Sequence, residues 1–294
     1  MRLIAALLLL TLQDPKVDLK WKFSKDAQLR WEMAQKLAIE SDSFGSEQEI
    51  TYTLKQTVKS VGDKGAELET TIEALKFKLT GAMGESEYDS SKDKKAPDDP
   101  IGGALAVMSG KTYSMTVDAS GTVTGIKGFD AIVQKMTEGL DADAEMAKGM
   151  IQQLFNDGVQ TAMLQMAFVQ LPREPVAAGG SWKNEFSLDM PVAGSLKFAI
   201  DGKLKAVRKG GDGGEAEIEQ DVKVTAGEGA GGMLELKGSK GTRKAVFHIE
   251  QGQLKSSALD VELQLKMADS ELPLKIEMKM KPLPANVASK DDKK

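Results

Sequence analysis

Apolar and polar residues alternate along most of the chain, which is the pattern of strands with one buried and one solvent-facing side. Shorter alternating segments at 112–117 and 122–126 flank the turn residues Asp118 to Gly121 and predict a hairpin. The clearest rows cover residues 17–23, 29–39, 52–58, 75–79, 196–206, 218–224, 259–267 and 274–280. This alternation predicts an antiparallel sheet of about ten strands.

A helical pattern replaces the alternation in the middle of the chain. Phe129, Ile132 and Met136 fall on one helical face, and similar stripes follow around Met150 and Met163. Acidic and amide residues at 141, 143, 156 and 157 suit helix starts, and prolines at 172 and 175 prevent continuation. The pattern predicts a three-helix insert over residues 128–171.

The order of strands, then helices, then strands favours the α+β class. We expect a large, curved, mainly antiparallel sheet, half-barrel-like, with the three-helix insert packed on its concave face. Residues 14–284 then form a single β-rich domain. The polar stretch 88–100 is expected to be a surface loop, and 285–294 a disordered charged tail.

The first residues have the pattern of a secretory signal peptide. Arg2 is followed by an apolar run from Leu3 to Leu12 and by a polar break at Gln13 and Asp14. The run is shorter than the roughly 20 residues that cross a bilayer. We expect 1–13 to be removed, with no stable membrane span afterwards and a periplasmic or extracellular location. A buried strand or an uncleaved anchor is the alternative.

Composition narrows the chemistry that the chain could perform. There is no cysteine, which excludes disulfides, thiolate metal sites and a lipid-modified N-terminal cysteine. The 39 basic and 44 acidic residues interleave to a net charge of −5, so nucleic acid is not an expected partner. The single histidine, His248, is predicted to face solvent on its strand and supports neither a two-histidine metal site nor a catalytic triad.

No catalytic constellation, cofactor motif or metal site is recognised, so the chain is predicted not to be an enzyme. A hydrolase that uses paired carboxylates stays open as a less favoured alternative, because acidic residues are numerous.

Ten short elements spread in order along the chain resemble a known family. They are Leu19-Lys20-Trp21-Lys22-Phe23, Leu29-Arg30-Trp31, Tyr88-Asp89-Ser90-Ser91, Gly110-Lys111, Val117-Asp118, Gly121-Thr122-Val123, Gly128-Phe129-Asp130, Leu171-Pro172, Pro175-Val176 and Gly180-Ser181-Trp182. The family resembled is an uncharacterised one of exported bacterial proteins, a domain of unknown function found mainly in planctomycete-type genomes. The resemblance implies export and fold but transfers no site. At the level of architecture, the expected sheet is also similar to the lipoprotein-carrier half-barrels of bacterial envelopes.

Methionine is the residue type that points to a function. The chain has 15 methionines, and several fall in the helical insert. Methionine is flexible and polarizable, so it either lines adaptable apolar pockets or fills a core. The candidate ligand-facing residues are Met136, Met146, Met150, Met163 and Met166. The leading hypothesis is an exported envelope protein that binds a lipid-like apolar ligand or another envelope protein. A structural or interaction module with a filled core is the alternative.

Overall fold

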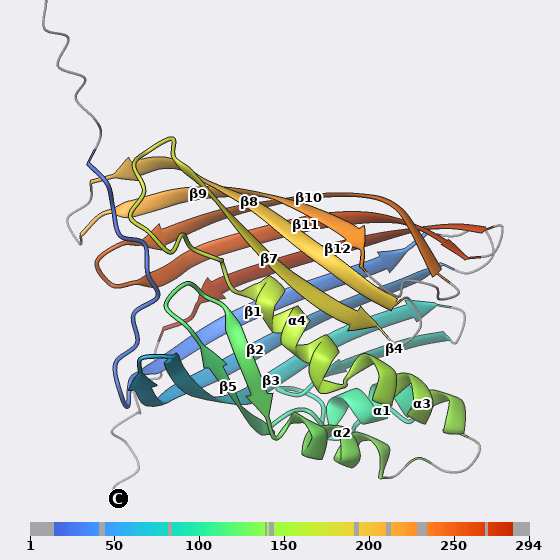
Figure 1. The fold of residues 1–294 in the computed structure, drawn as a ribbon. Coiled ribbons are helices and arrows are strands. Elements are labelled where there is room, and N and C mark those ends of the chain that lie inside the picture. The colour runs from blue at the N-terminus through green and yellow to red at the C-terminus, as the bar shows by residue number, and fades with distance from the viewer. Residues whose placement is uncertain are drawn as a thin grey trace, which may run out of the picture.

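Twelve strands form one open antiparallel sheet in the computed structural model of the protein (Figure 1). The structure describes residues 15–40, 45–81, 84–138, 140, 144–190, 194–209, 213–227, 234–267 and 270–284. The strands are β1 (Gln28–Ile39), β2 (Ser46–Gly62), β3 (Gly65–Gly81), β4 (Gly84–Asp89), β5 (Thr112–Val117), β6 (Val123–Lys127), β7 (Ser181–Met190), β8 (Gly194–Arg208), β9 (Glu215–Ala226), β10 (Leu234–His248), β11 (Gln253–Met267) and β12 (Ser270–Pro282). The helices are α1 (Pro100–Ala106), α2 (Phe129–Thr137), α3 (Glu145–Leu154) and α4 (Asp157–Ala167).

The strand order is β6-β5-β3-β2-β1-β12-β11-β10-β9-β8-β7, and β4 pairs with the free part of β3. The large antiparallel sheet is confirmed, although it has twelve strands rather than about ten. Strand β4 was not predicted. It lies largely ahead of the stretch 88–100 and ends inside it, and its sequence GESEYD has little alternation because none of its residues is fully buried on either face.

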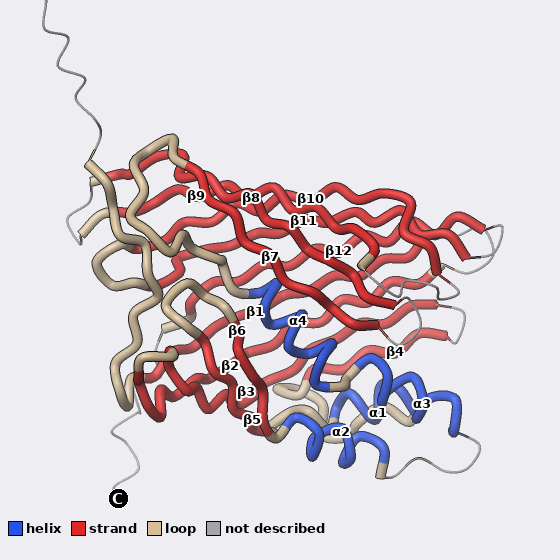
Figure 2. Tube along the Cα trace, viewed as in Figure 1, coloured by secondary structure: helices blue, strands red, loops and turns tan. Residues whose placement is uncertain are grey.

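The sheet curls around helix α4. Strands β6 and β7 stand at opposite ends of the strand order, yet both contact α4. Figure 2 shows the helices gathered on one side of the strands. We call the face of the sheet that carries Trp31, Met33 and Leu54 the inner face, and its side chains form the core with those of the helices.

The helical insert is found where the periodicity predicts it, but only part of it covers the sheet. Helix α4 contacts β6, β7 and β12, and α2 contacts β5, whereas α3 packs chiefly on α1 and α2. Helix α1 was not predicted. It begins at the end of the expected loop, where the Asp99 carboxylate accepts from the Gly102 N–H over 2.7 Å and from the Ser86 hydroxyl over 2.6 Å.

Residues 17–23 do not form the predicted strand. Apart from one bridge between Val17 and Val176, this segment crosses the end of the sheet without pairing along it. The apolar residues of this segment alternate with polar ones because their side chains enter the core, and not because the segment pairs as a strand. Leu19 and Trp21 are buried, and the Trp21 indole Nε1 donates to the carbonyl of Val169 over 3.0 Å.

Candidate functional site

A cavity of about 390 Å³ lies between the inner face of the sheet and the helices. Strands β1, β2, β3, β5 and β12 line one side, and helices α1, α2 and α4 line the other. The lining residues are Met33, Gln35, Leu37, Ile39, Ser46, Gln48, Ile50, Tyr52, Leu54, Ile72, Leu79, Ile101, Leu105, Met108, Tyr113, Phe129, Phe155, Val159, Gln160, Met163, Leu164 and Met278. This volume is within the usual range of small-molecule sites.

The strand period explains how the sheet builds its side of the cavity. In β1 every second residue from Met33 to Ile39 reaches the lining, and in β2 every second residue from Ser46 to Leu54 does so. The register sets Met33 opposite Tyr52 and Met278 opposite Gln35, so the lining is continuous across β2, β1 and β12.

The helices supply the opposite wall at helical spacing. Val159 and Met163 lie one turn apart on α4, and Leu164 is next to Met163 on the same side. Ile101 and Leu105 repeat the spacing on α1.

Burial changes along the length of the cavity. Leu54, Ile72, Met108 and Phe129 are almost fully buried at one end. Leu37, Ile39 and Leu79 are only half-buried at the other end, near the tips of β1, β2 and β3. The cavity therefore opens at these tips, where Ile39 and Ser46 also line a second hollow of about 720 Å³.

Polar groups in the lining are uncharged. Gln35, Ser46, Gln48 and Gln160 are half-buried, and the phenols of Tyr52 and Tyr113 lie deeper. Burial raises the pKa of both tyrosines well above the ordinary value, so their hydroxyls stay neutral at ordinary pH.

The candidate methionines are distributed unevenly. Met163 lines the cavity, whereas Met136 and Met166 are buried outside its lining. The side chains of Met146 and Met150 lie outside the described residues. Three methionines that the sequence did not single out, Met33, Met108 and Met278, also line the cavity. The polar lining residues were missed as well, although Gln35 in an otherwise apolar row was a signal of its own.

Buried polar side chains fix the end of α4 against the sheet. We call residues 166–171 the interior segment, because all of them are buried. Arg243, 2% exposed on β10, donates from Nη1 to the Phe168 carbonyl over 2.9 Å and from Nη2 to that of Met166. The carbonyl of Gln170 accepts from Gln220 Nε2 over 2.7 Å and from Trp182 Nε1 over 3.0 Å. Helix α4 is thereby held in place as a wall of the cavity.

The Arg243 guanidinium is buried without an acidic partner among the described residues. Desolvation lowers its pKa to about 10, so it remains protonated at neutral pH. Two of its acceptors are the backbone carbonyls of Met166 and Phe168 at the C-terminal end of α4, where the helix dipole favours a positive charge, and Nη1 also donates to Gln220 Oε1 over 3.3 Å.

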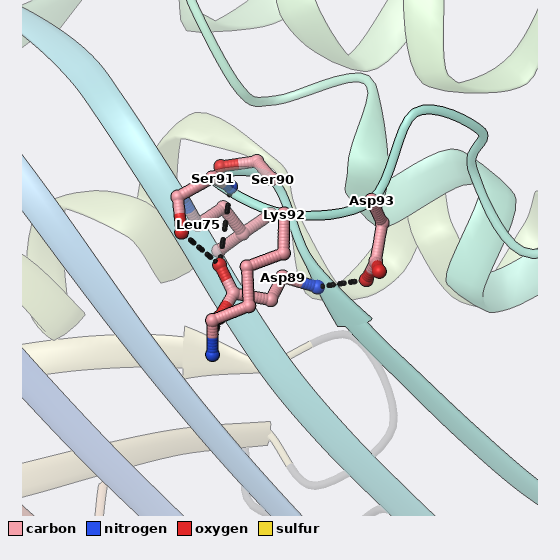
Figure 3. Close-up of polar contacts among 6 residues, drawn as sticks. All are labelled: Leu75, Asp89, Ser90, Ser91, Lys92 and Asp93. Carbon is pink, nitrogen blue, oxygen red and sulfur yellow. Dashed lines mark hydrogen bonds and ion pairs between the residues drawn. The ribbon is translucent and has the colours of Figure 1, made fainter.

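Figure 3 shows the turn that directs the chain from β4 toward α1. The Asp89 carboxylate accepts from the Ser91 hydroxyl over 2.6 Å and from the Ser91 N–H over 3.1 Å, and it pairs with Lys92. The Ser90 hydroxyl accepts from the Leu75 N–H over 2.9 Å. The Ser91 hydroxyl, then Lys92, lowers the pKa of Asp89 to about 2. These contacts fix the turn at the end of β4 against β3.

His248 does not face solvent as predicted, because it is only 6% exposed. His248 is the last residue of β10, and the turn that follows hydrogen-bonds back to it, since the Gly252 N–H donates to its carbonyl over 2.9 Å. Its Nδ1 accepts from the Gln251 N–H over 3.2 Å. Within the described ranges, no three acidic or histidine side chains are grouped to hold a metal ion.

Comparison with known proteins places the chain in a family. The model of the family described as "Family of unknown function (DUF6263)" matches residues 63–251, more than half of the 294 residues. The chain belongs to this family. Two of the short elements that resembled an uncharacterised family meet at the interior segment, because Trp21 donates to the carbonyl of Val169 and Trp182 to that of Gln170.

No curated protein matches the chain. Among solved structures, it is similar to lipovitellin from a study of lipid–protein interactions, with a TM-score of 0.46 and 11% identity over 90% of this chain. It spans only 26% of the length of that lipovitellin chain. It is also similar to an exported protein with a YmcC-like fold from Bacteroides fragilis, with a TM-score of 0.22 and 6% identity, over 88% of this chain and 97% of that one.

Within the described residues, no helix has the length and hydropathy to span a bilayer.

Proposed function

We propose that this protein binds an apolar, lipid-like ligand in the cavity between its sheet and its helices. The cavity itself carries the proposal. Its volume of about 390 Å³ and its mainly aliphatic, aromatic and methionine lining suit a hydrocarbon chain. A module with a filled core would bring these side chains into mutual contact, since interiors are otherwise packed with few voids larger than a water molecule.

The shape of the cavity also supports the binding of an apolar ligand. Its fully buried end accommodates apolar groups away from water, and its half-buried end gives a route for entry. Met33, Met108, Met163 and Met278 provide flexible side chains that adjust to ligands of different shape.

The proposal includes export and a non-enzymatic role. The apolar run from Leu3 to Leu12, which lies outside the described residues, supports secretion to the periplasm or the extracellular space. No acidic side chain of the described residues lines the cavity, which disfavours a carboxylate-dependent hydrolase acting there. The location is tested by fractionation and by the mass of the mature chain, which should lack the first residues.

Native mass spectrometry tests the binding proposal. The purified mature protein is measured as isolated and after incubation with a bacterial lipid extract. The proposal predicts a population with one bound lipid, released on collisional activation. An unliganded mass under both conditions would contradict it and favour the structural module.

A further inference from the structure

We propose that the ligand is a neutral amphiphile, in which an apolar chain carries an uncharged hydrogen-bonding head group. This inference rests on the proposed function and specifies its ligand class. It separates alcohols, glycerides and similar neutral lipids from fatty acid anions and from cationic amphiphiles.

The first observation is the absence of charge in the lining. None of the 22 described residues that line the cavity is an aspartate, glutamate, lysine, arginine or histidine. An ionised head group brought into this lining would lose its hydration without gaining an ion-pair partner, which makes its binding unfavourable relative to an uncharged head group.

The second observation is the position of the amides. Gln35 on β1 and Gln48 on β2 are diagonal neighbours on the inner face, because Gln35 is opposite Ile50 and Leu37 is opposite Gln48. Neither amide has a hydrogen-bond partner among the described residues. A glutamine amide both donates and accepts, so the pair matches a hydroxyl, an ester or an amide head group.

The third observation is the charge at the entrance. The hollow that shares Ile39 and Ser46 with the cavity is also lined by Glu40, Glu47 and Glu271. No basic residue lines it in the described part of the chain. Glu47 pairs with Lys36 over 2.9 Å and Glu40 with Lys275 over 2.7 Å, so these lysines are already engaged and the entrance offers an anionic ligand no basic group in its lining. Charged side chains of both signs line a different hollow, on the outer face, around Glu32, Lys205 and Lys281.

The test uses three probes with the same chain and different head groups. Decanol, decanoate and decylammonium are compared by isothermal titration calorimetry at neutral pH, with decanol below its aqueous solubility and the two ions below their critical micelle concentrations. We expect decanol to bind at least about tenfold more tightly than either ion, equivalent to about 1.4 kcal/mol. If either ion binds as tightly as decanol, the neutral-ligand inference is overturned and the apolar-ligand proposal stands. If no probe binds, both are overturned.

A variant and a pH series sharpen the test. Gln48→Glu should weaken decanol binding and shift the preference toward decylammonium, whereas Gln264→Glu, at an exposed position of β11, should leave the order of the probes unchanged. Decanoate affinity should rise as pH falls, by about tenfold per pH unit above the pKa of the free carboxyl group, because only the neutral acid is accepted. A flat pH profile, or an unchanged preference in a folded Gln48→Glu protein, would contradict the inference.

Discussion

The guanidinium of Arg243 on β10 donates a hydrogen bond to the carbonyl of Phe168 over 2.9 Å, which joins the sheet to the residue that follows α4. The same side chain donates to Met166, the penultimate residue of that helix. A buried cation thus holds the end of a helix whose other residues line the cavity. The stability of the fold and the shape of the cavity are coupled through this contact.

Replacement of Arg243 by methionine should destabilise the protein. The change keeps much of the side-chain volume but leaves the carbonyls of Met166 and Phe168 without this donor. We expect the free energy of unfolding to fall by about 2–4 kcal/mol, in line with two buried acceptors that lose a partner. Lys244→Met, at the exposed neighbouring position, should change it by less than about 0.5 kcal/mol. Urea unfolding measures both, and equal effects would contradict the role of Arg243.

Substitution of Gly121 should show how closely the chain packs around the interior segment. Gly121 has a φ of +86°, and an added Cβ would lie 2.5 Å from the Val169 carbonyl oxygen and 2.7 Å from Trp21 Nε1. Gly121→Ala should therefore cost about 2 kcal/mol or more through strain and displaced contacts. Gly125→Ala is the matched control, because nothing lies within 4 Å of the added atom. Thermal unfolding that lowers the Tm of both proteins alike would argue against this packing.

Filling the cavity should block ligand binding without unfolding the protein. Met163 is half-buried at the wall, and a tryptophan there would occupy part of the roughly 390 Å³. Met163→Trp should reduce binding of the apolar dye N-phenyl-1-naphthylamine by at least about tenfold. Gln134→Trp, on the exposed side of α2, should bind the dye as the natural protein does. Equal dye binding by all three folded proteins would place the site elsewhere.

The turn at Asp89 should make stability depend on pH in the acidic range. Its pKa in the folded protein, about 2, lies below the value of about 3.9 for an unfolded aspartate. The contribution of the ionised Asp89 carboxylate to the free energy of unfolding is therefore complete above about pH 4 and is lost as the pH falls toward 2. Asp89→Asn should be less stable than the natural protein at pH 6, and the difference should shrink as the pH falls. A difference that is constant across this range would contradict the contacts of Figure 3.

The sheet was predictable because strict alternation of apolar and polar residues indicates a strand with one buried face. The rows 29–39 and 259–267 became β1 and β11, and the helical stripe around Met163 became α4. Helix α1 was not predictable in the same way. It has seven residues, two of them glycine, and its stability depends on the Asp99 cap and on tertiary packing.

The candidate site was predictable only in part. The region between helices and sheet was the expected place, and Met163 is in the lining. The cavity itself is the space left by five strands and three helices, and no local pattern encodes that space. Gln35 was visible as a polar residue on an apolar strand face, whereas Gln48 lies outside the rows that were predicted as strands. His248 was misjudged, because strand alternation does not show that the turn after β10 hydrogen-bonds back to the last residue of that strand.

The most direct test is NMR of protein labelled with ¹³C at the methionine methyl groups, titrated with decanol. Every methionine in the cavity lining should shift as the ligand binds. These reporters are Met33, Met108, Met163 and Met278. Buried methionines outside the lining serve as internal controls. They are Met115, Met136, Met166 and Met280. Saturable shifts confined to the first group would support a neutral apolar ligand in this cavity. Shifts in the second group alone, or none at saturating decanol, would contradict it.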